Sequence, residues 1–136
     1  MTESTASRTP VNPWPWSLKV GYNQAEIVEG ATRQLVCAGQ TAVDADGNPQ
    51  HEGDMRAQIV LALDNLETVL KAGGMGLSDI VRLGIMTTDV DEAMGNFDVL
   101  GARLGAAGAT PPQTLIGVTR LALRPLMIEF EATAMR

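Results

Sequence analysis

The last part of the chain carries the pattern that most limits what it can fold into. Pro111 and Pro112 are adjacent. Because proline lacks a backbone N–H and restricts the residue before it, the pair ends any helix and starts an extended segment. In residues 127–132 side chains alternate with the two-residue period of a strand. That strand presents apolar side chains on one face, and Glu129 and Glu131 on the other.

The acidic face of this strand has two interpretations. Acidic side chains on a strand are usually solvated, and this remains the interpretation for Glu131. The alternative for Glu129 is that it faces a pocket opposite the Pro-Pro-Gln-Thr segment at 111–114. We expect a strand from Leu115 to Leu121 between them, followed by a turn at 122–125.

Two helices are predicted from apolar residues that recur at steps of three and four. The first runs to about Ala72, and Asp54 can cap its N-terminus. The second is expected from Asp91, as the cap, to about Ala107. Glycines follow each helix, which is typical of helix ends.

The remaining patterns indicate strands. Residues 24–29 and 34–38 flank a glycine turn and predict a hairpin, and residues 80–87 form a further strand between the helices. The order β-β-α-β-α-β-β indicates an α+β fold with one sheet and two helices on one of its faces. Two helices leave the other face bare, so we expect copies of the chain to associate across it.

The N-terminus is Ser/Thr-rich, and we expect a flexible leader over residues 1–13 and a single domain over residues 14–136. Trp14 and Trp16 lie between prolines in an extended path. Either one indole lines a pocket, or both pin this arm to the body or to a neighbouring subunit.

Composition excludes several classes of function. The net charge is −6 with only ten Lys and Arg residues, which argues against a nucleic-acid surface. A single cysteine, Cys37, allows neither an internal disulfide nor a cysteine-rich zinc site. No apolar run is long enough to span a membrane, and no apolar signal region opens the chain. We therefore expect a cytoplasmic protein without a membrane, metal or nucleic-acid partner.

Several short motifs occur in an order that resembles the YjgF/RidA family, often labelled endoribonuclease L-PSP. The matching segments are 21–24, 37–40, 64–66, 77–81, 88–89, 111–114 and 128–132. Together they extend over roughly residues 20 to 135, and their common order is more specific than any one of them.

The resemblance implies a fold, an assembly and a reaction. The subunit would be chorismate-mutase-like, and three copies would form a homotrimer whose sheets make an inner barrel with three clefts between neighbouring subunits. The implied reaction is hydrolysis of reactive imines and enamines to a 2-oxo acid and ammonia. It would need neither a metal nor an organic cofactor.

The resemblance also implies roles for individual residues. Tyr22 would close the cleft across the interface, and Glu129 would position the attacking water. The backbone of Gly39 and the segment Gln113–Leu115, which includes Thr114, would line the site for a small-molecule substrate.

Four positions depart from the family pattern. Gln113 stands where active deaminases have an arginine that grips the substrate carboxylate, and a neutral amide cannot replace that charged contact. Ala38 replaces a frequent serine, Leu115 a cysteine and Phe97 an asparagine that faces the cleft. The inferred pocket is less polar than the family's amino-acid site.

Three hypotheses follow. The first is an imine or enamine hydrolase that acts on a less anionic or more apolar substrate. The second is a non-catalytic trimer that binds or senses a small molecule in the same pocket. The third is an endoribonuclease, which the acidic charge disfavours.

Overall fold

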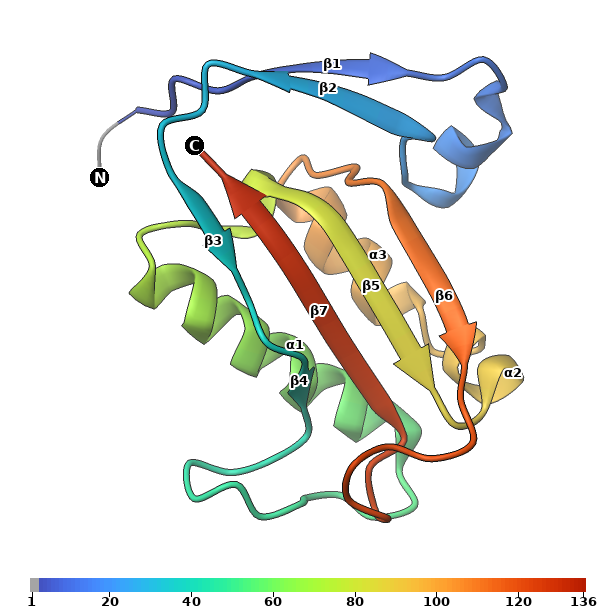
Figure 1. The fold of residues 1–136 in the computed structure, drawn as a ribbon. Helices are drawn as coiled ribbons and strands as arrows, with labels where there is room; N and C mark the ends of the chain where they lie inside the picture. The colour runs from blue at the N-terminus through green and yellow to red at the C-terminus, as the bar shows by residue number, and fades with distance from the viewer. Residues whose placement is uncertain (1–2) are drawn as a thin grey trace.

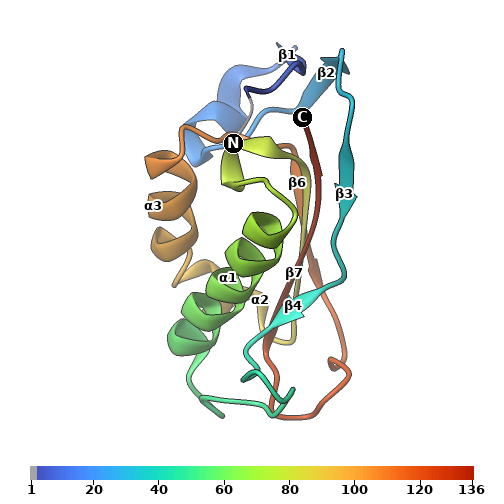
Figure 2. The same cartoon turned by 90° about the vertical axis from the view of Figure 1, so that its left-hand side faces the viewer.

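The computed structural model describes residues 3–136, and the first two residues of the expected leader lie outside the described part. Five strands form one mixed sheet in the order β3-β7-β5-β6, with β4 also paired to β7, and α1 and α3 lie on one face of this sheet (Figures 1 and 2). The elements are β1 (Ser7–Val11), a 3₁₀ helix (Pro15–Val20), β2 (Ala25–Glu29), β3 (Gln34–Val36), β4 (Gln40–Thr41), α1 (Met55–Ala72), a 3₁₀ turn (Leu77–Asp79), β5 (Ile80–Thr87), α2 (Val90–Met94), α3 (Asp98–Ala106), β6 (Gln113–Gly117) and β7 (Ile128–Met135). The predicted α+β class is confirmed.

Strand β7 is the centre of the sheet, because it pairs antiparallel with β3, β4 and β5. The predicted alternation is present: Ile128 and Phe130 are completely buried and Ala132 is 4% exposed, whereas Glu131 is exposed. The predicted strand is therefore confirmed from Ile128, one residue later than expected, and it continues three residues further, to Met135.

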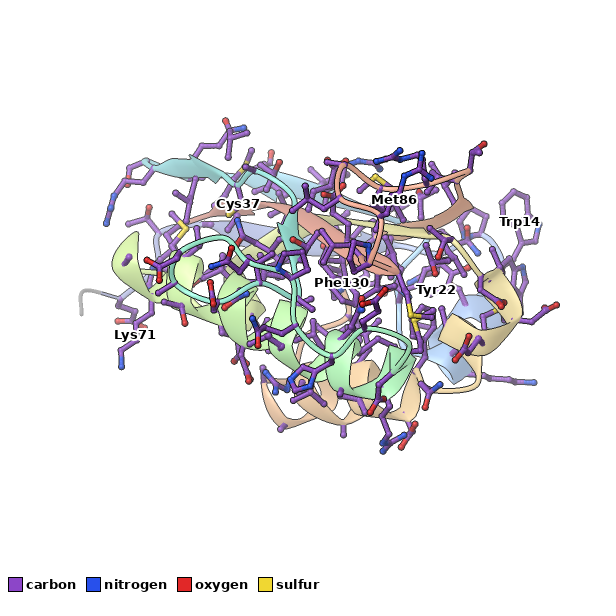
Figure 3. The ribbon with its side chains drawn as sticks, turned by 90° about the horizontal axis from the view of Figure 1, so that it is seen from below. Trp14, Tyr22, Cys37, Lys71, Met86 and Phe130 are labelled. Atoms are coloured by element: carbon purple, nitrogen blue, oxygen red, sulfur yellow. The ribbon has the colours of Figure 1, made fainter. Side chains whose placement is uncertain are left out.

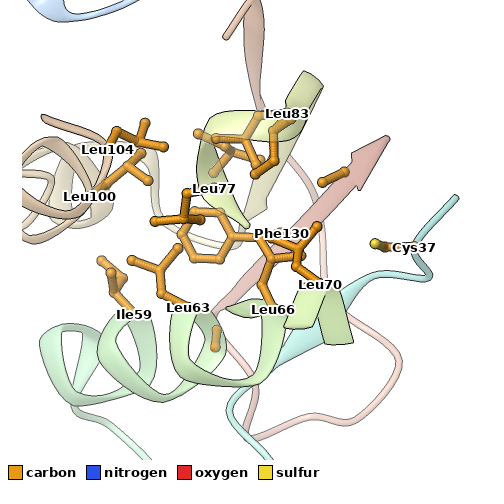
Figure 4. Packing of buried hydrophobic residues seen from close by; sticks show 14 of the residues in the cluster. Cys37, Ile59, Leu63, Leu66, Leu70, Leu77, Leu83, Leu100, Leu104 and Phe130 are labelled. Atoms are coloured by element: carbon orange, nitrogen blue, oxygen red, sulfur yellow. The ribbon is translucent and has the colours of Figure 1, made fainter. Parts of the chain in front are cut away.

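The core lies between this face of the sheet and the helices. The Phe130 ring sits among leucines from both helices, with Leu63 and Leu66 from α1 and Leu100 from α3 (Figure 4). Burying such side chains provides roughly 1.5–3 kcal/mol each, so this layer fixes how the helices sit on the sheet.

Helix α1 begins as predicted. The Asp54 carboxylate accepts a hydrogen bond from the Ala57 backbone N–H at 3.0 Å, and Gly73 ends the helix after Ala72. The apolar stripe that predicted the helix is its buried face.

The second predicted helix is divided. Instead of one helix from Asp91 to Ala107, α2 ends at Met94 and α3 begins at Asp98. Gly95 and Asn96 between them are poor helix formers. In addition, the Asn96 side-chain amide donates to the Glu92 backbone carbonyl at 2.9 Å, so a side chain competes for this carbonyl at the point where the helix would continue.

The cap of α2 is Asp89 rather than Asp91, because the Asp89 carboxylate accepts from the Glu92 N–H at 3.0 Å. We expect Asp89→Ala to lower the free energy of unfolding by roughly 0.5–2 kcal/mol, whereas Asp91→Ala, the matched control in the same turn, changes it little. Urea titration of both variants measures the difference. Equal losses would contradict this assignment of the cap.

The expected hairpin of residues 24–29 with 34–38 is not formed. Strand β2 pairs instead with β1 in a separate two-stranded sheet, and β3 pairs with β7. Part of the expected flexible leader is thus a strand, and the Arg8 guanidinium holds it in place. It donates to the Ile80 carbonyl and pairs with the Glu26 carboxylate, both at 2.6 Å. Alternation predicted the strands, but it carries no information about their partners.

Strand β6 begins earlier and ends earlier than predicted. It covers Gln113–Gly117 rather than Leu115–Leu121, and it runs parallel to β5. Beyond β6, the Leu121 side chain is buried in a small second core with Ala42 and Leu126. Gln113 and Thr114 therefore belong to β6, and their side chains point to opposite faces of the sheet.

Among residues 3–136, the helices are too short or too polar for any of them to cross a membrane.

Candidate functional site

A cavity of about 570 Å³ opens between the β6 edge of the sheet, α3 and the N-terminal 3₁₀ helix. Its lining comes from segments far apart in the sequence: Trp16, Val20, Gly21, Tyr22, Ile85, Met94, Phe97, Leu100, Gly101, Leu104, Gly105, Ala109, Thr110, Gln113 and Leu115. The volume is within the range of small-molecule sites, which are mostly apolar with a few polar groups.

Strand geometry brings the floor of the cavity together. Gln113 pairs with Leu83 and Leu115 with Ile85, so the side chains of all four residues point to the helix face. Thr114, between them, points to the opposite face.

The aromatic wall is set by the turn after the 3₁₀ helix. Gly21 adopts a φ of 89°, which a residue with a side chain rarely does, and this reverses the chain so that Tyr22 comes back onto Trp16. The two rings meet edge to face with centroids 6.1 Å apart. Trp16 lines the cavity although it is 55% exposed, whereas Trp14, which is 61% exposed, is not part of the lining.

The cavity has an uncharged lining. None of its described lining residues is Asp, Glu, Lys, Arg or His. The Thr110 hydroxyl already accepts a hydrogen bond from the Asn23 amide at 3.1 Å. The Gln113 Oε1 atom is buried and has no hydrogen-bond partner in the described part of the chain.

Glu129 lies on the other face of the sheet. It pairs with Met86 of β5 and Thr41 of β4, and its neighbour Phe130 points to the helices. Viewed along the sheet, Met86 and Phe130 lie on opposite sides of it (Figure 3). The Glu129 carboxyl group lies against Gly39, and a Cβ atom added to Gly39 would come within 2.6 Å of the Glu129 Cδ.

The environment of Glu129 favours its neutral form. Partial burial raises the pKa of the Glu129 carboxyl above its usual range, and repulsion from the Glu131 carboxylate raises it further. Perturbed carboxyl groups of this kind are candidates for proton transfer.

A smaller hollow of about 180 Å³ lies on the same face, lined by Val36, Cys37, Arg82, Gly84, Glu131, Ala132 and Thr133. Burial raises the pKa of the Cys37 thiol, so this cysteine stays protonated and is not activated as a nucleophile. Among the described residues, no group of three or more His, Cys, Asp or Glu side chains is arranged to hold a metal ion.

The structure divides the predicted site residues into two groups. Tyr22, Phe97, Gln113 and Leu115 line the cavity on the helix face. Within one subunit this group does not meet the predicted acid, Glu129.

The second group belongs to the bare face. Gly39 touches Glu129, and Ala38 precedes it as an exposed residue. Thr114 pairs with Gly84, which also pairs with Glu131, so Thr114 shares their face.

Sequence reasoning missed the contribution of α3. Gly101 and Gly105 lie four residues apart, so they share one side of the helix, and a Cβ at either would meet nothing within 4 Å. Glycine weakens a helix, so two glycines on one side of a helix need a reason. Because glycine has no side chain, this spacing could have indicated a hollow on that side of α3.

Comparison with known proteins decides the family. Residues 17–136 match the model of the family described as Endoribonuclease L-PSP. The chain belongs to the YjgF/RidA family. Membership of this family covers imine deaminase or related small-molecule roles.

Relatives within the YjgF/RidA family are distant in sequence. Protein DfrA of Myxococcus xanthus is 31% identical over 113 residues, which cover 83% of each chain. Among solved structures, the Rid-family protein YyfB from Yersinia pestis is similar with a TM-score of 0.84 and 31% identity, over 97% of this chain and 99% of that one. Escherichia coli TdcF, solved with bound serine, has a TM-score of 0.68 and 26% identity, over 85% and 87%.

Proposed function

We propose that the protein hydrolyses reactive imines or enamines to the corresponding oxo compound and ammonia, at clefts between the subunits of a homotrimer. The observation that carries this proposal is the Glu129 carboxyl, which rests on the Gly39 backbone with a raised pKa. Family membership supports it.

The reaction needs only water and one base. As the water oxygen bonds to the imine carbon, Glu129 accepts one proton of the water and the imine nitrogen takes one from solvent, which gives the neutral aminol. The aminol then collapses: the proton held by Glu129 passes to the nitrogen, the carbon–nitrogen bond breaks and ammonia leaves, while the aminol hydroxyl gives its proton to solvent. The carbonyl product keeps the oxygen of the water.

The division of the site over two faces supports an oligomer. Gln113 and Glu129 point away from opposite sides of one sheet, so a substrate that contacts both requires two subunits. The bare face also exposes Val36 at 71% and Ile116 at 52%, and burying such side chains against other copies is favourable. Closure of three sheets into an inner barrel would bring the cavity of one subunit to the acid of the next.

The proposal is tested by generating small imines in situ, including 2-iminopropionate and neutral analogues, and measuring ammonia release with and without the protein. We expect acceleration, with neutral or apolar imines preferred over 2-iminopropionate. The absence of acceleration for every imine, or a monomer in solution, would contradict the proposal.

The pH dependence should report Glu129. Because the base must be ionised and its pKa is raised, activity should be lost on acidification at a higher pH than for an ordinary glutamate. Glu131→Gln removes the repulsion that contributes to this shift, so its acidic limb should move to lower pH. The pH profiles of kcat/KM for both proteins measure this. Identical profiles would show that Glu131 does not act on the base.

A second function is favoured by the cavity. Its lining has no charge and the expected arginine is Gln113, which suits a protein that binds a small molecule without changing it. Ligand binding that occurs without any imine turnover would select this alternative. The net charge of −6 continues to disfavour the endoribonuclease role.

A further inference from the structure

Two side-chain amides of α1 hold the chain around Glu129 from the helix side of the sheet. Helix α1 packs against both β4 and β7 (Figures 1 and 2). Gln58 and Asn65 are seven residues apart, which is about two helical turns, so they project from the same side of α1. A polar side chain that faces a sheet is costly unless its hydrogen bonds are made. Both amides make theirs with backbone groups of segments next to the acid.

Gln58 fixes the start of β7. Its side chain is completely buried. The Gln58 Nε2 atom donates to the Pro125 carbonyl at 2.8 Å, and its Oε1 atom accepts from the Met127 backbone N–H, also at 2.8 Å. Met127 lies two residues before Glu129, so this amide sets where the strand that carries the acid begins.

Asn65 fixes the chain beside Glu129. Its Nδ2 atom donates to the Thr41 carbonyl at 2.8 Å and to the Val43 carbonyl at 3.0 Å. Thr41 pairs with Glu129 in the sheet, and Gly39, which lies against the Glu129 carboxyl group, comes two residues before Thr41. One amide therefore holds the segment that sets how closely Gly39 approaches the acid.

The strand in this segment is too short to fix itself. Strand β4 covers only Gln40–Thr41, and its strand partner in the described part of the chain is β7. Two residues contribute few hydrogen bonds to a sheet, since most strands have at least about three. The two bonds from Asn65 therefore add substantially to what holds this strand in place.

We propose that Asn65 is a positioning residue for the acid: it holds the carbonyls on either side of Ala42 and thereby keeps Gly39 against the Glu129 carboxyl group. The carboxyl group then stays where it can accept the proton of the attacking water. Asn65 acts through the backbone of this segment and not by contact with substrate. The inference rests on the proposed function for its catalytic consequence, but the effect on the surroundings of Glu129 can be measured without turnover.

The direct measurement is the titration of the Glu129 carboxyl carbon by ¹³C NMR, with the signal assigned by its absence in Glu129→Gln. Asn65→Leu has a similar size and removes both donors. Once the segment is released, the carboxyl group becomes better solvated. Because burial is the larger cause of its raised pKa, the pKa of Glu129 should fall towards the ordinary glutamate value. Cys37, Arg82 and Glu131, the ionisable residues of the small hollow on this face, are unchanged in the variant.

The matched control is Asn23→Leu. Asn23 is also buried, and its amide donates to the Thr110 hydroxyl at 3.1 Å, which places this bond at the helix-face cavity and away from Glu129. Both variants should lower the urea midpoint of unfolding, because each leaves buried groups without a partner. Only Asn65→Leu should change the titration of Glu129.

Kinetics test the catalytic consequence. Asn65→Leu should lower kcat for imine hydrolysis by roughly ten- to 100-fold and change KM little, because displacing a catalytic group by about 1 Å can cost that much while the cavity stays intact. If Asn65→Leu does not fold, Asn65→Ser is measured in its place. Its hydroxyl can donate to only one of the two carbonyls, so it should shift the Glu129 titration and kcat in the same directions by less.

The inference is overturned if Asn65→Leu lowers stability while Glu129 titrates as in the wild type, because the amide then only stabilises the fold. It is also overturned if Asn23→Leu moves the Glu129 titration equally. Wild-type kcat in Asn65→Leu would remove the positioning role and leave the proposed function standing. If the wild type hydrolyses no imine but Asn65→Leu alone shifts the titration, the proposed function falls and the role of Asn65 in holding Glu129 stands.

Discussion

Glu129→Gln is expected to lower kcat/KM for imine hydrolysis by at least about 100-fold, within the range of roughly 10²–10⁴ that a positioned general base contributes. The glutamine keeps the shape of the side chain on Gly39 but cannot accept the proton of the attacking water. Stability should not fall, since the variant removes a carboxylate whose charged form is disfavoured by burial and by Glu131.

The matched control for this variant is Glu131→Gln. Glu131 is on the same strand and the same face, two residues away, and it is exposed. Measured where both carboxylates are ionised, it should retain most of the wild-type kcat/KM. Equal losses in the two variants, or full activity in Glu129→Gln, would contradict the assignment of Glu129 as the base.

Local patterns predicted the parts of the fold that local forces determine. The alternation around Phe130 gave the position and buried face of β7, and the Asp54 cap with its apolar stripe gave α1. Both depend on periodicity and capping, which are visible within one turn or one strand. Gly95 and Asn96 could also have predicted the break in the second helix. The apolar residues on either side fit one continuous helical stripe, so a single helix was expected.

Pairing between distant segments could not be predicted in this way. Nothing in residues 7–11 indicates that they pair with residues 25–29. The two-residue period of a strand is the same whichever segment pairs with it. The same limitation affected the site. Gln113 and Glu129 were each recognised, yet their opposite directions depend on the pairing of β6 and β7 through β5.

In the proposed function the two faces of the sheet have separate roles. The helix face of β6 contributes a neutral cavity, while the bare face of β7 contributes an acid. Variants on one face can therefore change ligand preference without touching the base, and variants on the other can change the base without touching the cavity.

Gly39→Ala is expected to lower kcat/KM by roughly ten- to 100-fold, because displacing a catalytic group by about 1 Å can cost that much. The new Cβ would lie 2.6 Å from the Glu129 Cδ and 2.8 Å from its Oε1, so the carboxyl group must move. It is the far end of a flexible side chain, and moving it costs little stability. Displacement toward solvent should also lower the Glu129 pKa and shift the acidic limb of the pH profile to lower pH.

The control for Gly39→Ala is Gly84→Ala, which places a Cβ 2.8 Å from the Cγ of Glu131 and leaves Glu129 in place. Neither glycine has a positive φ, so both can be replaced without backbone strain. We expect Gly84→Ala to retain most of the activity in the molecules that stay folded, with unfolding followed by circular dichroism. If Gly39→Ala keeps both full activity and the wild-type pH profile, the close contact between Glu129 and Gly39 has no part in catalysis. A displaced base would have changed both the activity and the pH profile.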